Sequence, residues 1–373
     1  MAKAVNFHLA RRGVARPTLP ITLTFSVTNR CQSRCKTCLI WKFYENRPEL
    51  ARDELSLDEI ESVFRSMGKI VFFNLSGGEP FLRNDLPEIV ALSLEHLRPN
   101  IVHIPTNALS PERIERDVLK MLEHIGKNSP GVKLSVKPSL DGLHELHDDI
   151  RGVPGAFDKV IETIERLLPL SKRYPNFVLE VGTVISRLNS DSIDEIASFV
   201  HSLGVQSYRN ELAEIRTEFA NRDTEVTPSA TEYERATELF KRKTIASLKG
   251  KSRYTRTLES LRLVYYDLAV RTLHEQKQAI PCYAGISNAH LDPYGNVWPC
   301  CTLANDASLG NVRDADYNFL EVWRSEQADA VRASIRRCEC FCPLANQAYS
   351  NILLSPVWLM KTAAAFVRYG LFR

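Results

Sequence analysis

Three cysteines near the N-terminus are the residues of this chain best suited to chemistry. Cys31, Cys35 and Cys38 directly follow an apolar run, in the spacing C-x3-C-x2-C. Cysteine thiolates are the usual ligands of iron–sulfur clusters, and a cube of four irons needs four ligands. Three thiolates from one short loop hold three irons and leave the fourth iron open. An open metal position is typical of catalytic sites rather than of closed structural ones.

Six further cysteines form a second group near the C-terminus. No cysteine lies between residues 39 and 281, so every cysteine belongs to one of the two groups. The N-terminus lacks the apolar core of a secretory signal. We therefore expect a cytoplasmic protein, in which clustered cysteines bind metal more often than they form disulfides. The second group comprises Cys282, Cys300, Cys301, Cys338, Cys340 and Cys342.

The spacing of the first group resembles the signature of a known family. C-x3-C-x2-C is the spacing found in radical S-adenosylmethionine (SAM) enzymes, and the chain resembles them. A second segment supports the resemblance, because Gly77, Gly78, Glu79 and Pro80 follow the second apolar run. Paired glycines let the backbone approach a ligand closely. In the family this segment binds the amino group of SAM, so the resemblance implies that role for these four residues.

Polar residues after the third and fourth apolar runs match looser motifs of the family. Thr106 and Asn107 end the third run, and Ser139 and Asp141 end the fourth. The resemblance implies that these side chains contact SAM, those after the fourth run at its ribose. Arg151 resembles an arginine that pairs with the SAM carboxylate, since a guanidinium suits bidentate binding of a carboxylate. Each residue also fits a turn or a solvated loop, and that alternative stays open.

The resemblance also implies a reaction. The open iron binds the amino and carboxylate groups of SAM, and one electron cleaves SAM to methionine and a 5′-deoxyadenosyl radical. That radical takes a hydrogen atom from an unactivated carbon of the substrate. The protein contributes orientation and the exclusion of solvent. A flavodoxin- or ferredoxin-type protein is the expected electron donor.

The second cysteine group opens like the SPASM and Twitch domains of such enzymes. Cys282, Gly295 and Cys300 match the pattern C-x(9–15)-G-x4-C. The segment from Asp292 to Val297 predicts a hairpin, with Gly295 at a positive φ in its turn. The resemblance therefore implies an auxiliary iron–sulfur cluster in this region.

The ligands of the auxiliary cluster are only partly defined by the pattern. A full SPASM domain has more cysteines, and Cys338, Cys340 and Cys342 follow a different spacing. We expect one auxiliary [4Fe–4S] cluster on Cys282, Cys300 and two of these three, with Cys338 and Cys342 preferred. Cys301 is then spare or a ligand of a second, incompletely coordinated cluster. A structural zinc is the alternative, since four thiolates also suit Zn²⁺.

The fold that positions these groups follows from six apolar runs that alternate with helical patterns. Alternation of this kind predicts a parallel sheet with crossover helices, here a partial (β/α)6 TIM-like barrel of the α/β class. Active sites of parallel barrels lie at the carboxyl ends of the strands, where the three-cysteine loop falls. The predicted strands are Ile21–Val27, Ile70–Leu75, Ile101–Pro105, Val132–Leu140, Val178–Ser186 and Val205–Arg209.

Local signals predict where helices begin. Ser56 to Glu59 reads as a capping box, Ser110 before Pro111 fits an N-cap, and Ser190 or Asp191 is expected to cap a helix that runs to about Leu203. Two more helices are expected over Pro228–Lys243 and Arg256–His274. The predicted organisation is a basic extension (1–20), the barrel (21–215), a helical connector (216–280), the cysteine-rich domain (281–345) and an amphipathic C-terminal helix (346–373).

Charge is unevenly distributed although the net charge is only +3. This value gives no argument for nucleic acid as a partner, and no apolar segment is long enough to span a membrane. No acidic residue precedes Glu45 or follows Glu339. The basic, apolar segment Ile352–Phe372 is therefore expected either to lie on the inner face of an anionic membrane or to pack on the barrel.

The substrate is the least defined part of the prediction. Enzymes with this domain pair modify peptides, sulfatases, sugars, cofactor precursors and lipids. Only about twenty residues precede the first predicted strand, too few for a separate peptide-recognition domain. We expect a small or lipid-like substrate, with a peptide as the alternative. Glu211, Glu214 and Arg216 are candidates for substrate contact or for proton transfer. A non-catalytic iron–sulfur or zinc scaffold is the alternative of another class, which the three-cysteine loop and Glu79 disfavour.

Overall fold

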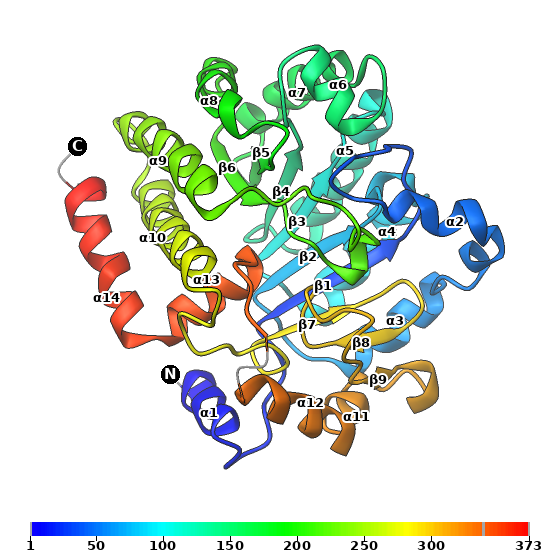
Figure 1. Ribbon diagram of the computed structural model, residues 1–373. Helices are drawn as coiled ribbons and strands as arrows, with labels where there is room; N and C mark the ends of the chain where they lie inside the picture. Colours follow the sequence, from blue (N-terminus) through cyan, green and yellow to red (C-terminus); the bar gives the residue numbers. More distant parts are fainter. Residues whose placement is uncertain (1, 338–339, 372–373) are drawn as a thin grey trace.

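One sheet of nine strands organises the computed structural model, which describes residues 2–337 and 340–371 (Figure 1). Its strands lie in the order β6-β5-β4-β3-β2-β1-β7-β8-β9. Neighbours among the first six are parallel, which confirms the predicted partial barrel. These six strands are β1 (Thr22–Thr28), β2 (Phe72–Gly77), β3 (Ile101–Thr106), β4 (Lys133–Pro138), β5 (Phe177–Ile185) and β6 (Ser207–Leu212).

The strands form a barrel because both of their faces are apolar enough to be covered. Every residue of β1 is buried. On its outer side Phe25 contacts Phe64 edge to face, and Phe64 contacts Phe73 in the same way. Figure 1 shows the crossover helices around the outside of the sheet. They are α3 (Leu57–Ser66), α4 (Leu86–Leu92), α5 (Pro111–Asn128), α6 (Glu145–Arg151), α7 (Ala156–Arg173) and α8 (Ile193–Ser202).

Two of the three predicted helix starts are confirmed. Ser56 and Glu59 form a reciprocal capping box at α3. Ser110 precedes Pro111 at the start of α5, although its side chain caps no backbone N–H. The cap at Ser190 or Asp191 is wrong, because a 3₁₀ turn (Ser190–Ser192) precedes α8. Ser192 precedes α8 instead, and Asn189 Oδ1 accepts from the Ser186 N–H at 2.8 Å, before the turn.

The cysteine-rich segment extends the barrel sheet rather than standing apart from it. β7 (Asn288–Leu291) pairs in parallel with β1, and β8 (Asn296–Trp298) and β9 (Gly310–Asn311) follow as antiparallel neighbours. The predicted hairpin is confirmed, with Gly295 at φ +92° in its turn. Short helices α11 (Phe319–Trp323) and α12 (Glu326–Arg336) complete the segment.

The connector folds as two helices, α9 (Ala230–Ser247) and α10 (Arg253–Glu275), each longer than predicted. The basic N-terminal extension contains a further helix, α1 (Ala2–Arg11), which the sequence reasoning missed. Its Phe7 and Ala10 are buried with Tyr283 and Ile286 of the cysteine-rich segment. The remaining short elements are α2 (Phe43–Asn46), a π turn (Ser93–Leu97), and 3₁₀ turns at Ile40–Lys42, Pro48–Arg52, Pro80–Leu82, Thr217–Phe219 and Arg313–Ala315.

The single C-terminal helix predicted over residues 346–373 is wrong. The chain forms α13 (Ala345–Leu354), then α14 (Pro356–Ala365) and a π-helical turn (Phe366–Leu371), with a bend of 100° between the two helices. Pro356 causes the break, because proline disfavours a helical conformation in the residue before it and lacks an N–H. Across the described residues, no single helix is long and apolar enough to cross a membrane.

Candidate functional site

The three-cysteine loop begins where β1 ends, at the carboxyl edge of the barrel. The segment after β2 holds it there through the backbone. The Gly78 N–H donates to the Thr28 carbonyl and the Glu79 N–H donates to the Arg30 carbonyl, each at 2.8 Å. The two segments predicted to share a SAM site are thus hydrogen-bonded directly to each other.

The paired glycines are required by this close approach. Gly77 has φ +115°, and a Cβ on it would lie 2.2 Å from the Thr28 carbonyl oxygen. A Cβ on Gly78 would lie 2.2 Å from the Arg30 carbonyl oxygen. Neither position has room for a side chain, because the obstacles are backbone atoms that cannot rotate away. The glycines therefore bring the cysteine loop against the end of β2.

A second segment holds the opposite side of the loop. The Arg34 and Lys36 N–H groups donate to the carbonyls of Arg151 and Ile150, each at 2.9 Å, at the end of α6. Gly152 follows with φ +64°, and a Cβ there would lie 2.3 Å from the Arg34 carbonyl oxygen. Glycine is again the residue that permits two backbones to touch.

The turn after β6 fixes the last part of the loop. The Leu39 N–H donates to the Phe219 carbonyl at 2.8 Å, and Asn221 Nδ2 donates to the Thr37 carbonyl at 2.9 Å. Segments from three separate parts of the barrel thus orient the three cysteines.

The thiols lie among hydrogen-bond donors. Asn107 Nδ2 donates to Cys31 Sγ at 3.6 Å, and Arg151 Nη1 donates to Cys35 Sγ at 3.7 Å. Burial, together with the neighbouring thiols, raises the pKa of Cys31 to about 12 and that of Cys38 still further. The raised pKa keeps the thiols of Cys31 and Cys38 neutral until a metal binds. Binding of an iron cluster requires thiolates and releases these protons, and the two donors would stabilise the sulfurs once they are ionised.

Glu79 is a buried acceptor that joins two strand ends. Its carboxylate accepts from Thr106 Oγ1 at 2.8 Å, from the Asn107 N–H at 2.7 Å and from the Phe81 N–H at 3.1 Å. A carboxylate has about four acceptor sites, so one remains for an ammonium group. Burial raises the pKa of Glu79 to about 7. Pro80, also buried, starts the turn that follows.

Arg151 already has a carboxylate partner inside the protein. Its Nη2 lies 2.8 Å from Asp141 Oδ2, and both residues are buried. Asp141 Oδ1 also accepts from the Val184 N–H at 2.8 Å. Asp141 thus orients the guanidinium toward Cys35. Ser139, half-buried, donates its N–H to the Thr106 carbonyl at 3.0 Å and lies at the same strand edge.

The cysteines of the second group that the structure describes surround one small apolar core. Cys282, Cys300 and Cys301 are buried in it with Ala284, Ile335 and Leu344, and half-buried Cys342 packs against it. Burial raises the pKa of Cys282 to about 11 and that of Cys342 to about 12, with the neighbouring thiols acting in the same direction. Cys340 is half-buried, and Cys338 lies outside the described residues.

The three polar residues expected to contact substrate are engaged within the protein. Glu211 forms a close ion pair with Lys137, and Glu214 forms one with Arg216. The Lys137 side chain, on β4, lies against Gly182. A Cβ on Gly182 would be 2.8 Å from Lys137 Cδ. These charges are therefore neutralised in pairs.

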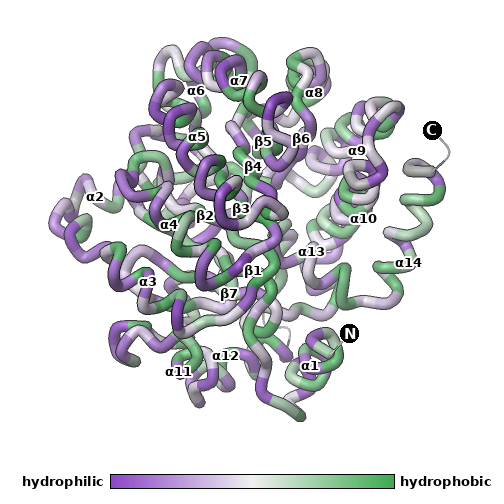
Figure 2. Tube along the Cα trace, turned by 180° about the vertical axis from the view of Figure 1, so that it is seen from behind, coloured by the Kyte–Doolittle hydropathy of each residue, from purple (hydrophilic) through white to green (hydrophobic). Residues whose placement is uncertain are grey.

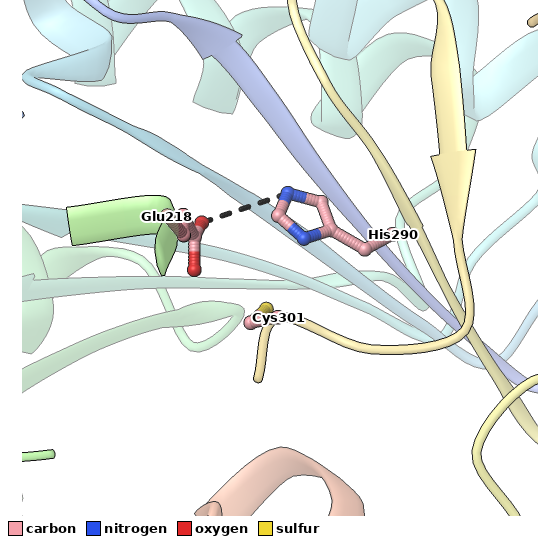
Figure 3. A group of neighbouring side chains, drawn as sticks. All are labelled: Glu218, His290 and Cys301. Carbon is pink, nitrogen blue, oxygen red and sulfur yellow. Dashed lines mark ion pairs between the residues drawn. The ribbon is translucent and has the colours of Figure 1, made fainter. Parts of the chain in front are cut away.

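Sequence reasoning missed two residues beside Cys301. Glu218, in the turn after β6, and His290, on β7, lie with Oε1 and Nε2 3.7 Å apart (Figure 3). Glu218 is also near enough to Cys38 to add to the rise of that thiol's pKa. No motif marks either residue, since only the pairing of β7 with β1 brings them together.

Comparisons with known proteins agree with this arrangement. The family model of the radical SAM superfamily matches residues 25–200, and the model of SPASM, an iron–sulfur cluster-binding domain, matches residues 282–343. The chain therefore belongs to the radical SAM superfamily and carries a C-terminal SPASM domain. It is an enzyme whose cofactors are SAM and [4Fe–4S] clusters.

Similar proteins include heme synthases and peptide maturation proteins. An AdoMet-dependent heme synthase of Methanosarcina barkeri is 26% identical over 330 residues, covering 86% of each chain. The subtilosin biosynthesis protein AlbA of Bacillus subtilis is 24% identical and covers 88% of this chain and 66% of its own length. The mycofactocin maturase MftC of Mycolicibacterium smegmatis is 29% identical over 50% of this chain and 43% of its own.

Solved structures share the fold. SuiB of Streptococcus suis bound to S-adenosylmethionine superposes with a TM-score of 0.59 at 16% identity, over 88% of this chain and 70% of that one. The enzyme anSMEcpe with AdoMet and a peptide gives 0.58 at 16% identity, over 94% and 97%. At this identity the likeness concerns the fold alone.

Replacement of Gly78 by alanine should prevent assembly of the cluster on the three-cysteine loop. The new Cβ meets the Arg30 carbonyl, so the loop must shift away from the end of β2. After anaerobic reconstitution we expect Gly78→Ala to hold about half the iron of the wild type, since the auxiliary cysteines are remote from the change. Iron and sulfide analysis measures this.

Gly126→Ala is the matched control, because Gly126 lies inside α5 with no atom within 4 Å of a Cβ. It should retain all iron and gain a few tenths to about 1 kcal/mol of stability. Full iron loading of Gly78→Ala would show that the contact between loop and strand does not position the cysteines.

Proposed function

We propose that Cys31, Cys35 and Cys38 hold the SAM-binding [4Fe–4S] cluster and that the enzyme abstracts hydrogen from a small or lipid-like molecule. The observation that carries the proposal is the joining of this loop to the Gly77–Pro80 segment and to the end of α6 through backbone hydrogen bonds. When bound, the cluster and SAM supply a 5′-deoxyadenosyl radical. The chain's own residues orient the reactants and exclude water.

Each residue of the site has a task in this proposal. Glu79 offers its remaining acceptor site to the amino group of SAM, while its other contacts hold Thr106 and Asn107 in place. Asn107 and Arg151 donate to the Cys31 and Cys35 sulfurs that would hold the cluster. Because Asp141 holds one edge of the Arg151 guanidinium, the arginine would meet the SAM carboxylate only with its other edge. Ser139, which follows β4 at the carboxyl edge of the sheet, is the proposed ribose contact.

The second cysteine group is proposed to hold one auxiliary [4Fe–4S] cluster that accepts an electron from the substrate radical. Cys282, Cys300 and Cys342 supply three thiolates around the small apolar core, and Cys338 or Cys340 supplies the fourth. Four protein ligands leave no iron open, which favours electron transfer over substrate ligation. Exposed basic residues on the three-cysteine loop suit docking of an acidic flavodoxin- or ferredoxin-type donor: Arg30, Arg34, Lys36 and Lys42.

A small substrate is favoured because the alignment with the heme synthase relative covers 86% of each chain. The match therefore extends over most of both chains. A peptide substrate is the second candidate. Two similarities favour it: the match to AlbA covers 88% of this chain, and MftC is a maturase.

Removal of the three cysteines should abolish the radical reaction while sparing the auxiliary cluster. The reconstituted wild type should hold about eight irons and produce 5′-deoxyadenosine after reduction, whereas Cys31/Cys35/Cys38→Ala should hold about four and produce none. Iron analysis and chromatography of the same samples measure both. Iron without any cleavage of SAM in the wild type would favour the non-catalytic scaffold. About four irons in the wild type, with zinc at the second group, would remove the auxiliary electron acceptor.

The substrate class is tested by the coupling of SAM cleavage to turnover. One arm uses Fe-coproporphyrin III, the compound after which another similar protein, an Fe-coproporphyrin III synthase, is named. If the substrate is a tetrapyrrole acid, this compound should accelerate the formation of 5′-deoxyadenosine, and its own mass should decrease. Lipid extracts and cysteine-containing peptides form the other arms of the experiment. Acceleration by peptides alone, with deuterium from the peptide recovered in 5′-deoxyadenosine, would replace the small-molecule proposal by the peptide one.

Contact with the inner face of the membrane is proposed through α14. One side of this helix packs on α10 with Trp358 buried, while Val357 and Met360 are 57% and 64% exposed. Figure 2 shows hydrophobic stretches along α14 at the edge of the molecule. The charged residues of this region are basic, with Lys361 inside α14 and Arg368 in the turn that follows it. This pattern suits an interfacial position on anionic lipid.

Substitution of the two exposed residues should release the protein from anionic vesicles. Val357→Glu/Met360→Glu should float with them several-fold less than the wild type, because the change removes apolar contact and adds like charge. Leu119→Glu, at an exposed apolar position on α5, is the control. Truncation is unsuitable, because Asn351 accepts from the Tyr283 N–H at 3.0 Å inside the protein. Equal recovery of all three proteins in the soluble fraction would contradict the membrane proposal.

A further inference from the structure

Glu218, His290 and Cys301 converge at a place that neither cluster accounts for. One ligand atom from each lies within 4.8 Å of the other two. Figure 3 shows them approaching from three elements, the turn after β6, strand β7 and the loop after β8. Carboxylate, imidazole and thiolate are the three protein ligand types that Zn²⁺ accepts.

The group is buried, and its hydrogen bonds are incomplete. His290 is 1% exposed, and its Nδ1 has no hydrogen-bond partner among the described residues. Glu218 Oε2 is likewise buried and without a hydrogen bond in the described part of the chain. Buried polar atoms in this condition call for an explanation, and an absent ion is one of them.

The other imidazole nitrogen is placed as a metal-binding histidine requires. His290 Nε2 lies 2.8 Å from Ser26 Oγ, on β1. If Nε2 carries the proton and donates it to the serine, Nδ1 keeps its lone pair and is free to bind a cation. Metal-bound histidines usually donate their second nitrogen in this way, which fixes the tautomer and the ring.

The site opens onto a small cavity. A space of about 130 Å³ is lined by Glu218 and His290 together with Ser26, Asn29 and residues of the β7–β8 hairpin. Three protein ligands beside such a space leave a fourth position for water or substrate. This is the arrangement of catalytic rather than structural zinc sites.

The neighbouring charges permit a divalent ion. Arg216 Nη1 lies 3.9 Å from Glu218 Oε2, but the close ion pair with Glu214 neutralises that guanidinium. A divalent cation held by one carboxylate and one thiolate leaves the site without net charge. Such a site can be buried without the penalty of an uncompensated ion.

We propose that Glu218, His290 and Cys301 bind one Zn²⁺ ion, with its open position facing the cavity between β1 and the hairpin. Because Glu218 also lies near Cys38, this ion would stand between the two cysteine groups. There it could polarise a carbonyl or carboxyl group of the substrate. The site is independent of the substrate class and does not require that Cys301 serve an iron cluster.

Metal analysis of the full-length reconstituted enzyme tests this proposal. The protein is equilibrated with Zn²⁺ in the presence of a weak chelator, desalted, and analysed for zinc and iron. His290→Asn and Glu218→Gln should each lose one zinc equivalent relative to the wild type while their iron is unchanged. Zinc should also raise the melting temperature of the wild type and not that of His290→Asn, since only a folded site binds it.

The exposed pair of His274 and Glu234, 2.8 Å apart, provides matched controls. His274→Asn and Glu234→Gln make the same chemical changes and should keep all zinc. The proposal would be overturned if His290→Asn bound as much zinc as the wild type, or if the wild type bound no more zinc than the two site variants. Loss of iron from Cys301→Ser would also overturn it, because that result makes Cys301 a ligand of the auxiliary cluster.

Discussion

The backbone hydrogen bonds that fasten the three-cysteine loop to its neighbours are the constraint on which the site depends. The loop has little regular structure of its own, and fixing such a segment costs conformational entropy. The end of β2, the end of α6 and the turn after β6 supply that order. Each contact point except the last includes a glycine whose missing side chain allows two backbones to meet. The barrel thus sets the positions of the sulfurs, and the loop sequence supplies their spacing.

Charge around the site is balanced inside the protein. Asp141 neutralises Arg151, Glu211 neutralises Lys137, and Glu214 neutralises Arg216. Buried ions are costly without partners, so each pair allows a charged group to lie near the cofactors without a net field. An anionic ligand or a reduced cluster would therefore contact hydrogen-bond donors and the unpaired side of the Arg151 guanidinium. It would not contact cations that lack a partner. Selectivity in such a site comes from geometry more than from long-range attraction.

The sequence was sufficient for features governed by local pattern. Alternating apolar runs predicted six strands, and the glycine at the β7–β8 turn predicted a hairpin that the structure contains. The bend before Pro356 was also visible in the sequence, because proline interrupts a helix, but the amphipathic pattern on both sides was taken as one helix. The apparent cap at Ser190 failed because residues 190–192 form a 3₁₀ turn of their own, so that α8 begins only at Ile193.

The approach of His290 to Glu218 had no sequence signal. It depends on the parallel pairing of β7 with β1, and the two strands are more than two hundred residues apart in the chain. Periodicity reports which face of an element is apolar, but it does not report which distant strand will lie beside it. For the same reason the hydrogen bonds of Glu79, which connect two strand ends, could not be read from its motif.

The pairing of β7 with β1 also means that the C-terminal domain is not a detachable module. Without β7, residues Thr22–Phe25 of β1 would lose their partner on this side, which leaves unpaired N–H and carbonyl groups on a strand that is buried throughout. Long apolar edges of this kind recruit other chains and aggregate. The auxiliary domain thus has a second task that needs no iron, which is to terminate the barrel. A protein that had lost its auxiliary cysteines during evolution would still be expected to keep this hairpin.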